Sequence, residues 1–147
     1  HVVELVGYQL RRAGIEVRFD LDENDAVVLA DHFQMEQLFL NLVLNAVQSM
    51  PRGGELVLRT RVGEETVVAE VRDSGTGIPE EIRDRIFDPF FTTREVGEGT
   101  GLGLSVSDSI TAAHGGAIEV KSTLGVGTIF RVELPVLPEG APKGEIS

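Results

Sequence analysis

The chain of 147 residues contains no cysteine and few basic residues, and each shortage removes a class of function. Without cysteine there can be no disulfide framework, no thiol nucleophile and no zinc site built on thiolates. The 13 lysines and arginines are outnumbered by 24 acidic residues, which gives a formal net charge of −11. This charge repels phosphate backbones and anionic membrane surfaces, so we expect neither a nucleic-acid partner nor direct membrane contact.

Long apolar runs are also missing, because no stretch approaches the ~20 residues of a membrane-spanning helix. The chain begins at His1, and no basic flank precedes an apolar stretch, so we expect no signal peptide and interpret the chain as a piece of a longer protein. Hydrophobic residues make up 41% of the chain, enough for one core at this length. We therefore expect one domain, with a cytoplasmic location.

Periodicity and turn residues predict a mixed order of helices and strands. Asp31, with Gln34 three residues later, predicts the cap of a long helix that ends near Ser49. Further helices are expected over residues 1–13, 79–87 and 100–114. Strands are expected over residues 15–21, 26–30, 55–61, 66–72, 117–122 and 128–134.

This order is typical of an α+β fold, a two-layer sandwich in which a mixed, largely antiparallel sheet is covered on one face by helices. The folded domain is expected over residues 1–134. From Pro135 onward, prolines and glycines are frequent, and residues 135–147 are expected to form a disordered tail.

The long helix carries a row of uncharged amides on one face, namely Gln34, Gln37, Asn41, Asn45 and Gln48. A solvated outer face would more often carry Lys or Glu in a chain with 25% charged residues. We therefore favour the interpretation that the amides line an interior cleft. An amide oxygen can ligate a hard cation such as Mg²⁺ and leave it positive enough to hold phosphates.

Glycine supplies 17 residues, many of them clustered, where about ten are usual at this length. In the loop over residues 73–79, Gly75 and Gly77 permit a positive φ and the close approach of a flat ligand. Asp73 precedes them and accepts hydrogen bonds when ionised, so it suits the exocyclic amine of adenine, whereas guanine would present a carbonyl oxygen. A tight turn with a local cap is the alternative interpretation.

A second glycine cluster, over residues 97–104, runs into a predicted helix, where successive backbone N–H groups form an anion site. It is not a phosphate loop, because the chain has no Gly-Lys pair, and its spacing does not fit a dinucleotide fingerprint. Between the two clusters, residues 86–94 hold three phenylalanines. These either pack under a loop or form a hinge and docking patch beside a lid.

In this order, the segments resemble the catalytic ATP-binding domain of sensor histidine kinases, in the superfamily that includes gyrase and the heat-shock chaperone. The similarity covers roughly residues 5–134. It rests on five motifs. In chain order they are an asparagine box (residues 41–46), a first glycine box (73–79), a phenylalanine box (87–93), a second glycine box (99–104) and a glycine turn (125–128). The nitrogen-regulation type looks most similar, and the implied fold is the Bergerat ATP-binding fold.

The resemblance implies a site for ATP and Mg²⁺. Asn45 would ligate the metal, with Asn41 beside it near the phosphates, and Arg94 could reach the γ-phosphate. Asn41 and Arg94 are thus the implied catalytic residues. The second glycine box would bring backbone N–H groups to the phosphates. Besides Asn41, Asn45 and Arg94, the implied contacts on this side are Thr92, Thr93, Gly99, Thr100, Gly101, Leu102, Gly103 and Leu104.

On the adenine side, the resemblance implies that Asp73 binds the exocyclic amine. Gly75 and Gly77 would lie under the ring, with Ile78 beside them, and Thr128 would support Asp73 or an ordered water. One departure from the family pattern matters here, since many members have Lys or Arg where this chain has Gln48. The affinity for ATP is therefore expected to be modest.

The resemblance also implies a reaction. Hydrolysing relatives have a Glu where this chain has Asn41, which cannot act as a base, so we expect phosphoryl transfer rather than ATP hydrolysis. The acceptor would be a histidine on separate dimerisation helices of the same protein, and a response regulator receiver domain would follow. Neither His32, expected on the surface, nor His114, expected to cap a helix, is a candidate acceptor.

Two alternatives stay open at this point. The first is a serine/threonine kinase of the same superfamily, such as an anti-sigma factor, although such proteins usually lack the phenylalanine box. The second is a non-catalytic module that senses nucleotide or binds a partner and has kept the fold.

Overall fold

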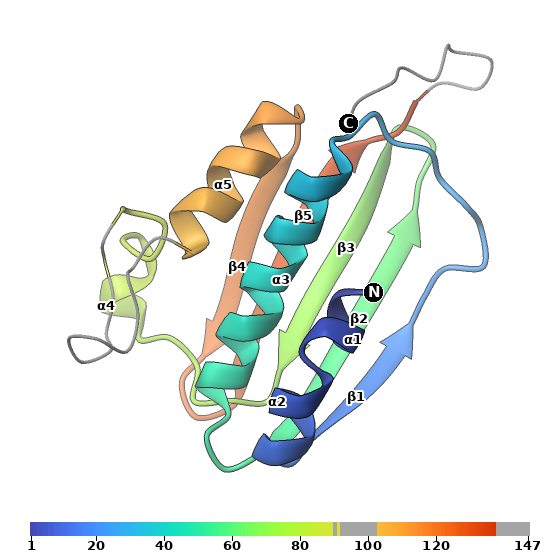
Figure 1. The fold of residues 1–147 in the computed structure, drawn as a ribbon. Helices are drawn as coiled ribbons and strands as arrows, with labels where there is room; N and C mark the ends of the chain where they lie inside the picture. The colour runs from blue at the N-terminus through green and yellow to red at the C-terminus, as the bar shows by residue number, and fades with distance from the viewer. Residues whose placement is uncertain (90, 92–102, 138–147) are drawn as a thin grey trace.

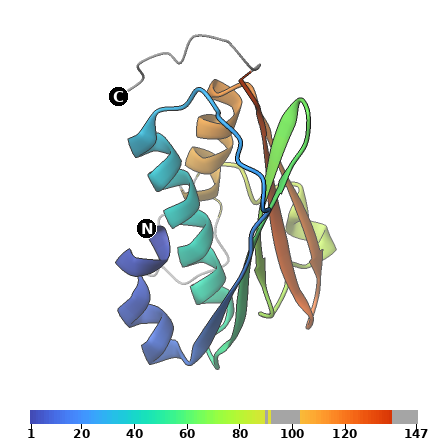
Figure 2. The same ribbon diagram turned by 90° about the vertical axis from the view of Figure 1, so that its right-hand side faces the viewer.

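The structure, a computed structural model, describes residues 1–89, 91 and 103–137 and contains one five-stranded sheet with helices on one face (Figures 1 and 2). In spatial order the strands are β1 (Ile15–Asp20), β2 (Gly54–Val62), β3 (Thr66–Asp73), β5 (Gly127–Pro135) and β4 (Ala117–Thr123). β1 pairs with β2 in parallel, and the other three pairs are antiparallel. The predicted sandwich with a mixed, largely antiparallel sheet is confirmed.

The helical layer consists mainly of two helices that lie side by side, α3 (His32–Ser49) and α5 (Gly103–Ala113) (Figure 2). Two short helices at the N-terminus, α1 (Val2–Leu5) and α2 (Gly7–Ala13), lie beside α3, and α4 (Glu80–Arg83) lies beyond the β4 edge of the sheet (Figure 1). None of the helices in the described ranges combines the length and apolar character needed to cross a membrane.

The cap of α3 is the one that the sequence predicts. The Asp31 carboxylate accepts a hydrogen bond from the Gln34 backbone N–H at 3.1 Å, and the helix ends one residue before Met50 and Pro51. Its buried residues are Leu38, Leu42, Val43 and Ala46. They pack into a core with inward residues of the strands, among them Leu56, Val71, Phe130 and Val132.

Two predicted elements are wrong in detail. The helix predicted over residues 1–13 is broken at Val6, whose φ of −108° and ψ of 11° leave the helical region. Val6 is buried in the core and is followed by Gly7, which disfavours helix, so packing sets the backbone here. The helix predicted over residues 79–87 is an α-helix only over Glu80–Arg83. The turns that follow are closed by hydrogen bonds between residues three apart, such as Asp88 N–H to Arg85 C=O at 3.0 Å, instead of four apart.

The strand predicted over residues 26–30 is not a strand. Burial alternates along it as in an extended chain, but the segment crosses the end of the sheet on its way to α3 (Figure 1). Its Val27 carbonyl accepts a hydrogen bond from Leu137 N–H at 2.7 Å instead of joining a ladder. Alternation predicts which side chains turn inward, whereas a strand also requires a neighbouring strand within reach.

The end of the domain lies beyond the predicted boundary at Leu134. Pro135 is the last residue of β5, and Val136 N–H donates to Glu65 C=O at 2.9 Å. Residues 135–137 are therefore ordered, which corrects the predicted start of the tail. Residues 138–147 lie outside the described residues, and for them the prediction of disorder stays a prediction.

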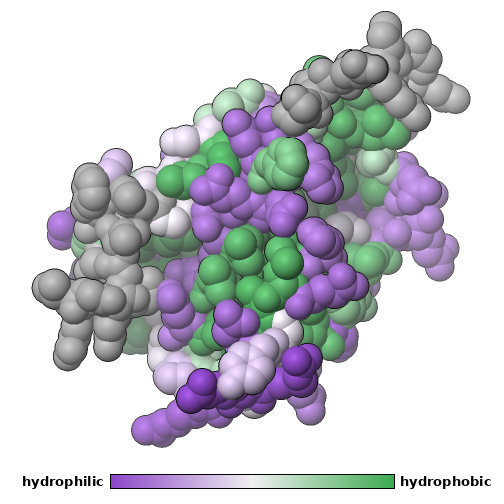
Figure 3. Space-filling view, in the orientation of Figure 1, coloured by the Kyte–Doolittle hydropathy of each residue, from purple (hydrophilic) through white to green (hydrophobic). Residues whose placement is uncertain are grey.

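The two faces of the sheet differ in chemistry. On the face without helices, ion pairs link neighbouring strands, such as Arg59 Nε to Asp20 Oδ2 at 3.4 Å and Arg131 Nη1 to Glu119 Oε2 at 3.5 Å. These charges keep the face in water and explain why helices cover only the other one. On the helical face, apolar side chains remain visible around α3 (Figure 3), where Leu40 and Leu44 are half-buried.

Candidate functional site

The loop over residues 73–79 lies between the end of α3 and the turn that joins β4 to β5. Thr76 N–H donates to Ser49 C=O at 3.0 Å, and Thr76 C=O accepts from Gly125 N–H at 2.7 Å. One residue of the loop is thus held by both neighbours. The loop, the second half of α3 and the β4–β5 turn form one continuous region, which carries most of the predicted site residues that the structure describes.

The row of amides on α3 is divided between two environments. Asn41 and Asn45 are half-buried, whereas Gln34, Gln37 and Gln48 are exposed. The prediction that the whole row lines an interior cleft is therefore wrong for the three glutamines. For Asn41 and Asn45 the half-burial is compatible with a cleft, and the prediction that they line one stays a prediction.

Asn41 joins α3 to the start of α5. Its side-chain Nδ2 donates to the backbone carbonyl of Gly103, the first residue of α5, at 3.3 Å. Gly103 itself is exposed, and no atom of the described residues lies within 4 Å of the place where a Cβ would stand. The start of α5 is thus fixed by a side chain of α3 and has open space beside it.

Asp73 is the last residue of β3 and is only 8% exposed. Its Oδ1 accepts a hydrogen bond from Gly75 N–H at 2.9 Å, while its Oδ2 is buried and has no hydrogen-bond partner among the described residues. Burial raises the pKa of this carboxyl above its usual value, and the polar hydrogens of Gly75, Ser49 and Thr128 oppose the rise. A buried acceptor without a partner is costly, and a ligand that donates a hydrogen bond would offset this cost, so the predicted role of Asp73 in binding an amine stays a prediction.

The two glycines of this loop have a structural role that the sequence does not reveal. A Cβ on Gly75 would overlap the backbone carbonyl of Ser49, and a Cβ on Gly77 would overlap that of Thr123. Gly77 has a positive φ of 76°, as predicted, whereas Gly75 does not have one. The close approach that the structure shows is therefore to the protein's own backbone, and contact with a flat ligand stays a prediction.

Ser122 is a site residue that sequence reasoning missed. Its hydroxyl lies 2.9 Å from the Thr128 hydroxyl and accepts from Ile78 N–H at 2.7 Å. Thr128 is 3% exposed and lies opposite Asp73 in the register of β3 and β5. Its hydroxyl thus pairs with Ser122 rather than with the Asp73 carboxylate. The alternation of β4 contained the signal, since it places Ser122 on the inward face with Ile118 and Val120.

Arg83 of α4 was also missed. Its Nη2 donates to Ser122 C=O at 2.8 Å and to Ile78 C=O at 3.2 Å, so it links the loop over residues 73–79 to β4. Ile78 packs against the core and is bound through both of its backbone polar groups. The predicted contact residue Ile78 therefore has a firm structural position.

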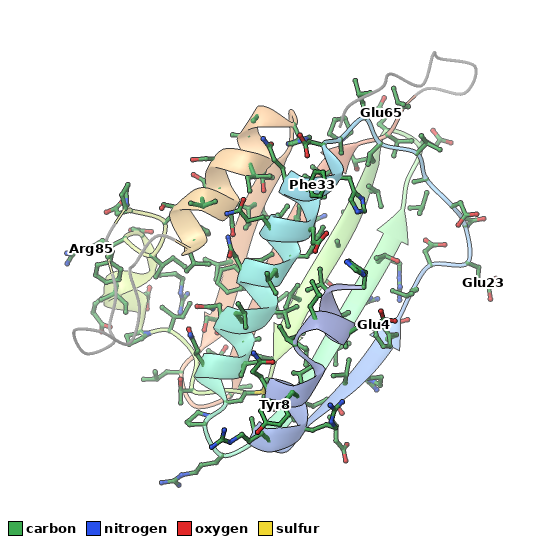
Figure 4. All side chains as sticks on the ribbon, viewed as in Figure 1. Glu4, Tyr8, Glu23, Phe33, Glu65 and Arg85 are labelled. Atoms are coloured by element: carbon green, nitrogen blue, oxygen red, sulfur yellow. The ribbon has the colours of Figure 1, made fainter. Side chains whose placement is uncertain are left out.

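The phenylalanine-rich segment packs inward as far as the structure describes it. Phe87 meets the core residue Phe130 edge to face, with ring centroids 6.3 Å apart. Phe91 is half-buried, and the guanidinium of Arg85 lies 4.7 Å from its ring centroid (Figure 4). Phe87 and Phe91 therefore pack against the core, while Phe90 lies outside the described residues, and a role as a hinge or docking patch stays a prediction.

The other predicted site residues belong to the segment from Thr92 to Leu104. Leu104 lies in the first turn of α5 and packs against the core. The remaining predicted contacts lie outside the described residues. They are Thr92 and Thr93 of the phenylalanine box, Arg94 after it, and Gly99, Thr100, Gly101 and Leu102 of the second glycine box. Their roles stay predictions.

Comparison with known proteins agrees with this arrangement. Residues 30–138 match the model of the family described as histidine kinase-, DNA gyrase B-, and HSP90-like ATPase. The sensor kinase CckA of Brucella abortus is 44% identical in an alignment of 140 residues that covers 85% of this chain and 15% of CckA. The chain spans less than a third of the length of the curated relatives it matches.

Solved structures show the same fold. The catalytic domain of histidine kinase ThkA is 36% identical with a TM-score of 0.81, over 91% of this chain and 88% of that domain. Full-length ShkA in complex with AMPPNP is 33% identical with a TM-score of 0.83, over 96% of this chain and 30% of ShkA. ThkA in complex with response regulator protein TrrA is 33% identical with a TM-score of 0.78, over 95% of this chain and 40% of that chain.

The buried carboxylate predicts a pH-dependent cost to stability. The pKa of Asp73 is raised in the folded state from its ordinary value of 3.8. The free energy of unfolding therefore falls as the pH rises from 3.8 to the pKa of the folded state, and this loss stays constant at higher pH. Asp73→Asn should therefore raise the free energy of unfolding at pH 7 by roughly 1 kcal/mol. Urea denaturation of both proteins measures this difference.

The control for this measurement is Asp25→Asn, at an exposed aspartate outside the site, which should leave the free energy of unfolding unchanged. The gain from Asp73→Asn should shrink when the experiment is repeated near pH 4. A loss of stability at pH 7 would show that Oδ2 already has a partner within the protein, and would contradict the assignment of a ligand to it.

Proposed function

The chain belongs to the family of histidine kinase-, DNA gyrase B- and HSP90-like ATPases, and from this premise we propose that it is the ATP-binding catalytic domain of a sensor histidine kinase. It binds ATP with Mg²⁺ and donates the γ-phosphoryl group to a histidine on separate dimerisation helices. The single observation that carries the proposal is the buried Oδ2 of Asp73 at the end of β3, which has no hydrogen-bond partner within the part of the chain that the structure describes.

Adenine recognition follows from the two oxygens of Asp73. Oδ1 is held by Gly75 N–H, so Oδ2 is left to accept from the exocyclic amine of adenine. Guanine would place a carbonyl oxygen against this carboxylate, and the two acceptors would repel each other. Full-length ShkA, whose catalytic part shares the fold, was solved with AMPPNP, an analogue of ATP, which supports a nucleotide as the ligand.

The phosphate side depends on Asn45 and the start of α5. No group of three or more His, Cys, Asp or Glu residues that could hold a metal occurs within the described ranges. An Mg²⁺ ion at the Asn45 carbonyl oxygen would therefore take its other ligands from phosphates and water, which is the way Mg²⁺ is commonly bound. The ion would neutralise phosphate charge beside a protein of strongly negative net charge.

The direction of transfer follows from Asn41. This amide donates to Gly103 C=O and has no basic group, so it cannot activate water. The γ-phosphoryl group is kept for a better nucleophile, a histidine of the dimerisation helices. His114 is not this acceptor, because both of its ring nitrogens are engaged in hydrogen bonds.

Arg94, which lies outside the described residues, is proposed to stabilise the charge on the transferred group. A response regulator receiver domain is proposed as the final partner, supported by the complex of ThkA with the response regulator TrrA.

The adenine assignment predicts a change of base preference in Asp73→Asn. Gly75 N–H keeps the amide oxygen in the place of Oδ1, so the amide nitrogen takes the place of Oδ2 and presents a donor to the base. ATP affinity should fall at least about tenfold, because a charge-assisted hydrogen bond is lost and two donors face each other. GTP affinity should rise. Calorimetry with both nucleotides measures the two constants, and equal losses for ATP and GTP would contradict the assignment.

The metal assignment predicts that Asn45→Ala separates the effects of metal and nucleotide. Its affinity for Mg-ATP should fall at least about tenfold, a loss typical even of residues that only support a metal ligand. Its affinity for ATP in EDTA should stay unchanged. Gln37→Ala, which removes an exposed amide of the same helix, is the matched control. If Asn45→Ala keeps the full Mg²⁺ enhancement of ATP binding, the metal is held elsewhere.

The reaction is tested by mixing the domain with Mg-ATP and the separately produced acceptor helices of the parent protein. We expect phosphate on the helices that is labile in acid and stable in alkali, as phosphohistidine is, and little free phosphate. Omission of the helices should leave the ATP almost intact. An acid-stable product would indicate a serine/threonine kinase, and binding without any transfer would indicate a non-catalytic module.

A further inference from the structure

A histidine connects the two large helices at the end that is remote from the nucleotide loop. His114 follows the last residue of α5, and its Nδ1 lies 2.7 Å from the backbone carbonyl of Ile110, one turn earlier. Its Nε2 lies 3.1 Å from the backbone nitrogen of Asp31, the cap of α3. The ring is half-buried between the two helix ends.

The two partners fix the state of the ring. A carbonyl oxygen only accepts, so the proton must be on Nδ1, and the Asp31 N–H only donates, so Nε2 must offer its lone pair. The Asp31 carboxylate is separately engaged with Gln34 N–H, as the cap of α3. One neutral imidazole thus closes the end of α5 and binds the backbone at the start of α3.

The same two helices are also linked at the other end, by the bond from Asn41 Nδ2 to Gly103 C=O. Asp31 and Asn41 are ten residues apart on α3, and Gly103 and His114 are eleven apart on α5, about 15 Å and about 16 Å along the two axes. The helices are antiparallel, so the spacing between the two links is nearly the same along both helices (Figure 1). Together they set the register of α5 along α3.

The packed surface between these links combines small and apolar side chains of α5. The buried residues of α5 are Ser107, Ile110 and Thr111. The Ser107 hydroxyl donates to Gly103 C=O at 2.8 Å and the Thr111 hydroxyl to Ser107 C=O at 2.7 Å, both within α5. Ser107 and Thr111 allow close contact, and Ile110, Leu104 and Val106 add apolar packing against the core, so the polar links at the ends contribute to the register together with this packing.

We propose that His114 is a positioning residue of the nucleotide site. By holding the end of α5 to the start of α3, it places Gly103 beside Asn41, where the start of α5 would meet the phosphates. This inference rests on the function proposed above, and it assigns that site a determinant one full helix length away from it. His114 touches neither nucleotide nor metal and acts only through α5.

Two substitutions separate the two hydrogen bonds of His114, because each keeps only one of them. In His114→Gln, the side-chain oxygen reaches the place of Nε2 and can still accept from Asp31 N–H. In His114→Asn, the shorter amide keeps the donor near Nδ1, toward Ile110 C=O, and has no acceptor that reaches Asp31. His32→Asn is the matched control, because His32 neighbours Asp31 in sequence and its side chain is 77% exposed.

The expected result is a difference between the two variants. In His114→Asn, amide exchange of Asp31 should rise about fivefold, the loss of one ordinary hydrogen bond, and ATP affinity should fall by a similar factor. Affinity for adenosine should stay unchanged, because the base pocket at Asp73 does not involve α5. His114→Gln and His32→Asn should match the native chain in all three measurements, made by NMR exchange and titration.

Three results would overturn the inference. They are unchanged Asp31 exchange in His114→Asn, equal losses of ATP and adenosine affinity in that variant, or a His114→Gln variant as impaired as His114→Asn. If His114→Asn does not fold, imidazole nitrogen shifts of the native chain decide, since a proton on Nε2 contradicts the bond to Asp31. Failure of the proposed function is distinguishable, because the native chain would then bind neither ATP nor adenosine whatever the state of the link.

Discussion

The physical constraint on which the site depends is a carboxylate that is buried with one oxygen unsatisfied. Asp73 lies at the end of β3, and burial raises its pKa although hydrogen bonds from Gly75, Ser49 and Thr128 oppose the rise. A fold selected for stability alone would place an amide or an apolar residue there. In the proposed function a ligand supplies the missing donor, so the energetic cost and the proposed binding role belong to the same carboxylate.

The surrounding contacts keep this carboxylate in one orientation. Gly75 binds one oxygen, and the absence of a side chain on Gly75 allows the loop to lie close to Ser49. Below it, the Ser122 hydroxyl joins Ile78, Gly127 and Thr128 into a polar cluster. The Asp73 side of the proposed site is thus held by hydrogen bonds of the loop and of β4, whereas the phosphate side depends on α5, which runs antiparallel to α3 and is bonded to it at both ends. Different contacts therefore position the two halves of the proposed site.

Elements with strong local signals were predicted well. The cap at Asp31, the hairpin of β2 and β3, and the position of Asp73 at the end of a strand all follow from neighbours within a few residues. The strand expected over residues 26–30 failed because alternation was present without a neighbouring strand. The amide row was only half right, since a helical period shows which residues share a face and not what covers it.

The sequence by itself determined the periods of the helices and strands, the glycine turns, the four-residue spacing of Asn41 and Asn45, and the family. Tertiary structure alone decided which oxygen of Asp73 has no partner, and that His114 meets Asp31, 83 residues away. The reason is one of range. Local patterns are fixed by sterics within a turn or a pleat, whereas contacts between distant segments exist only after the helices have packed on the sheet, when burial makes each unpaired polar atom costly.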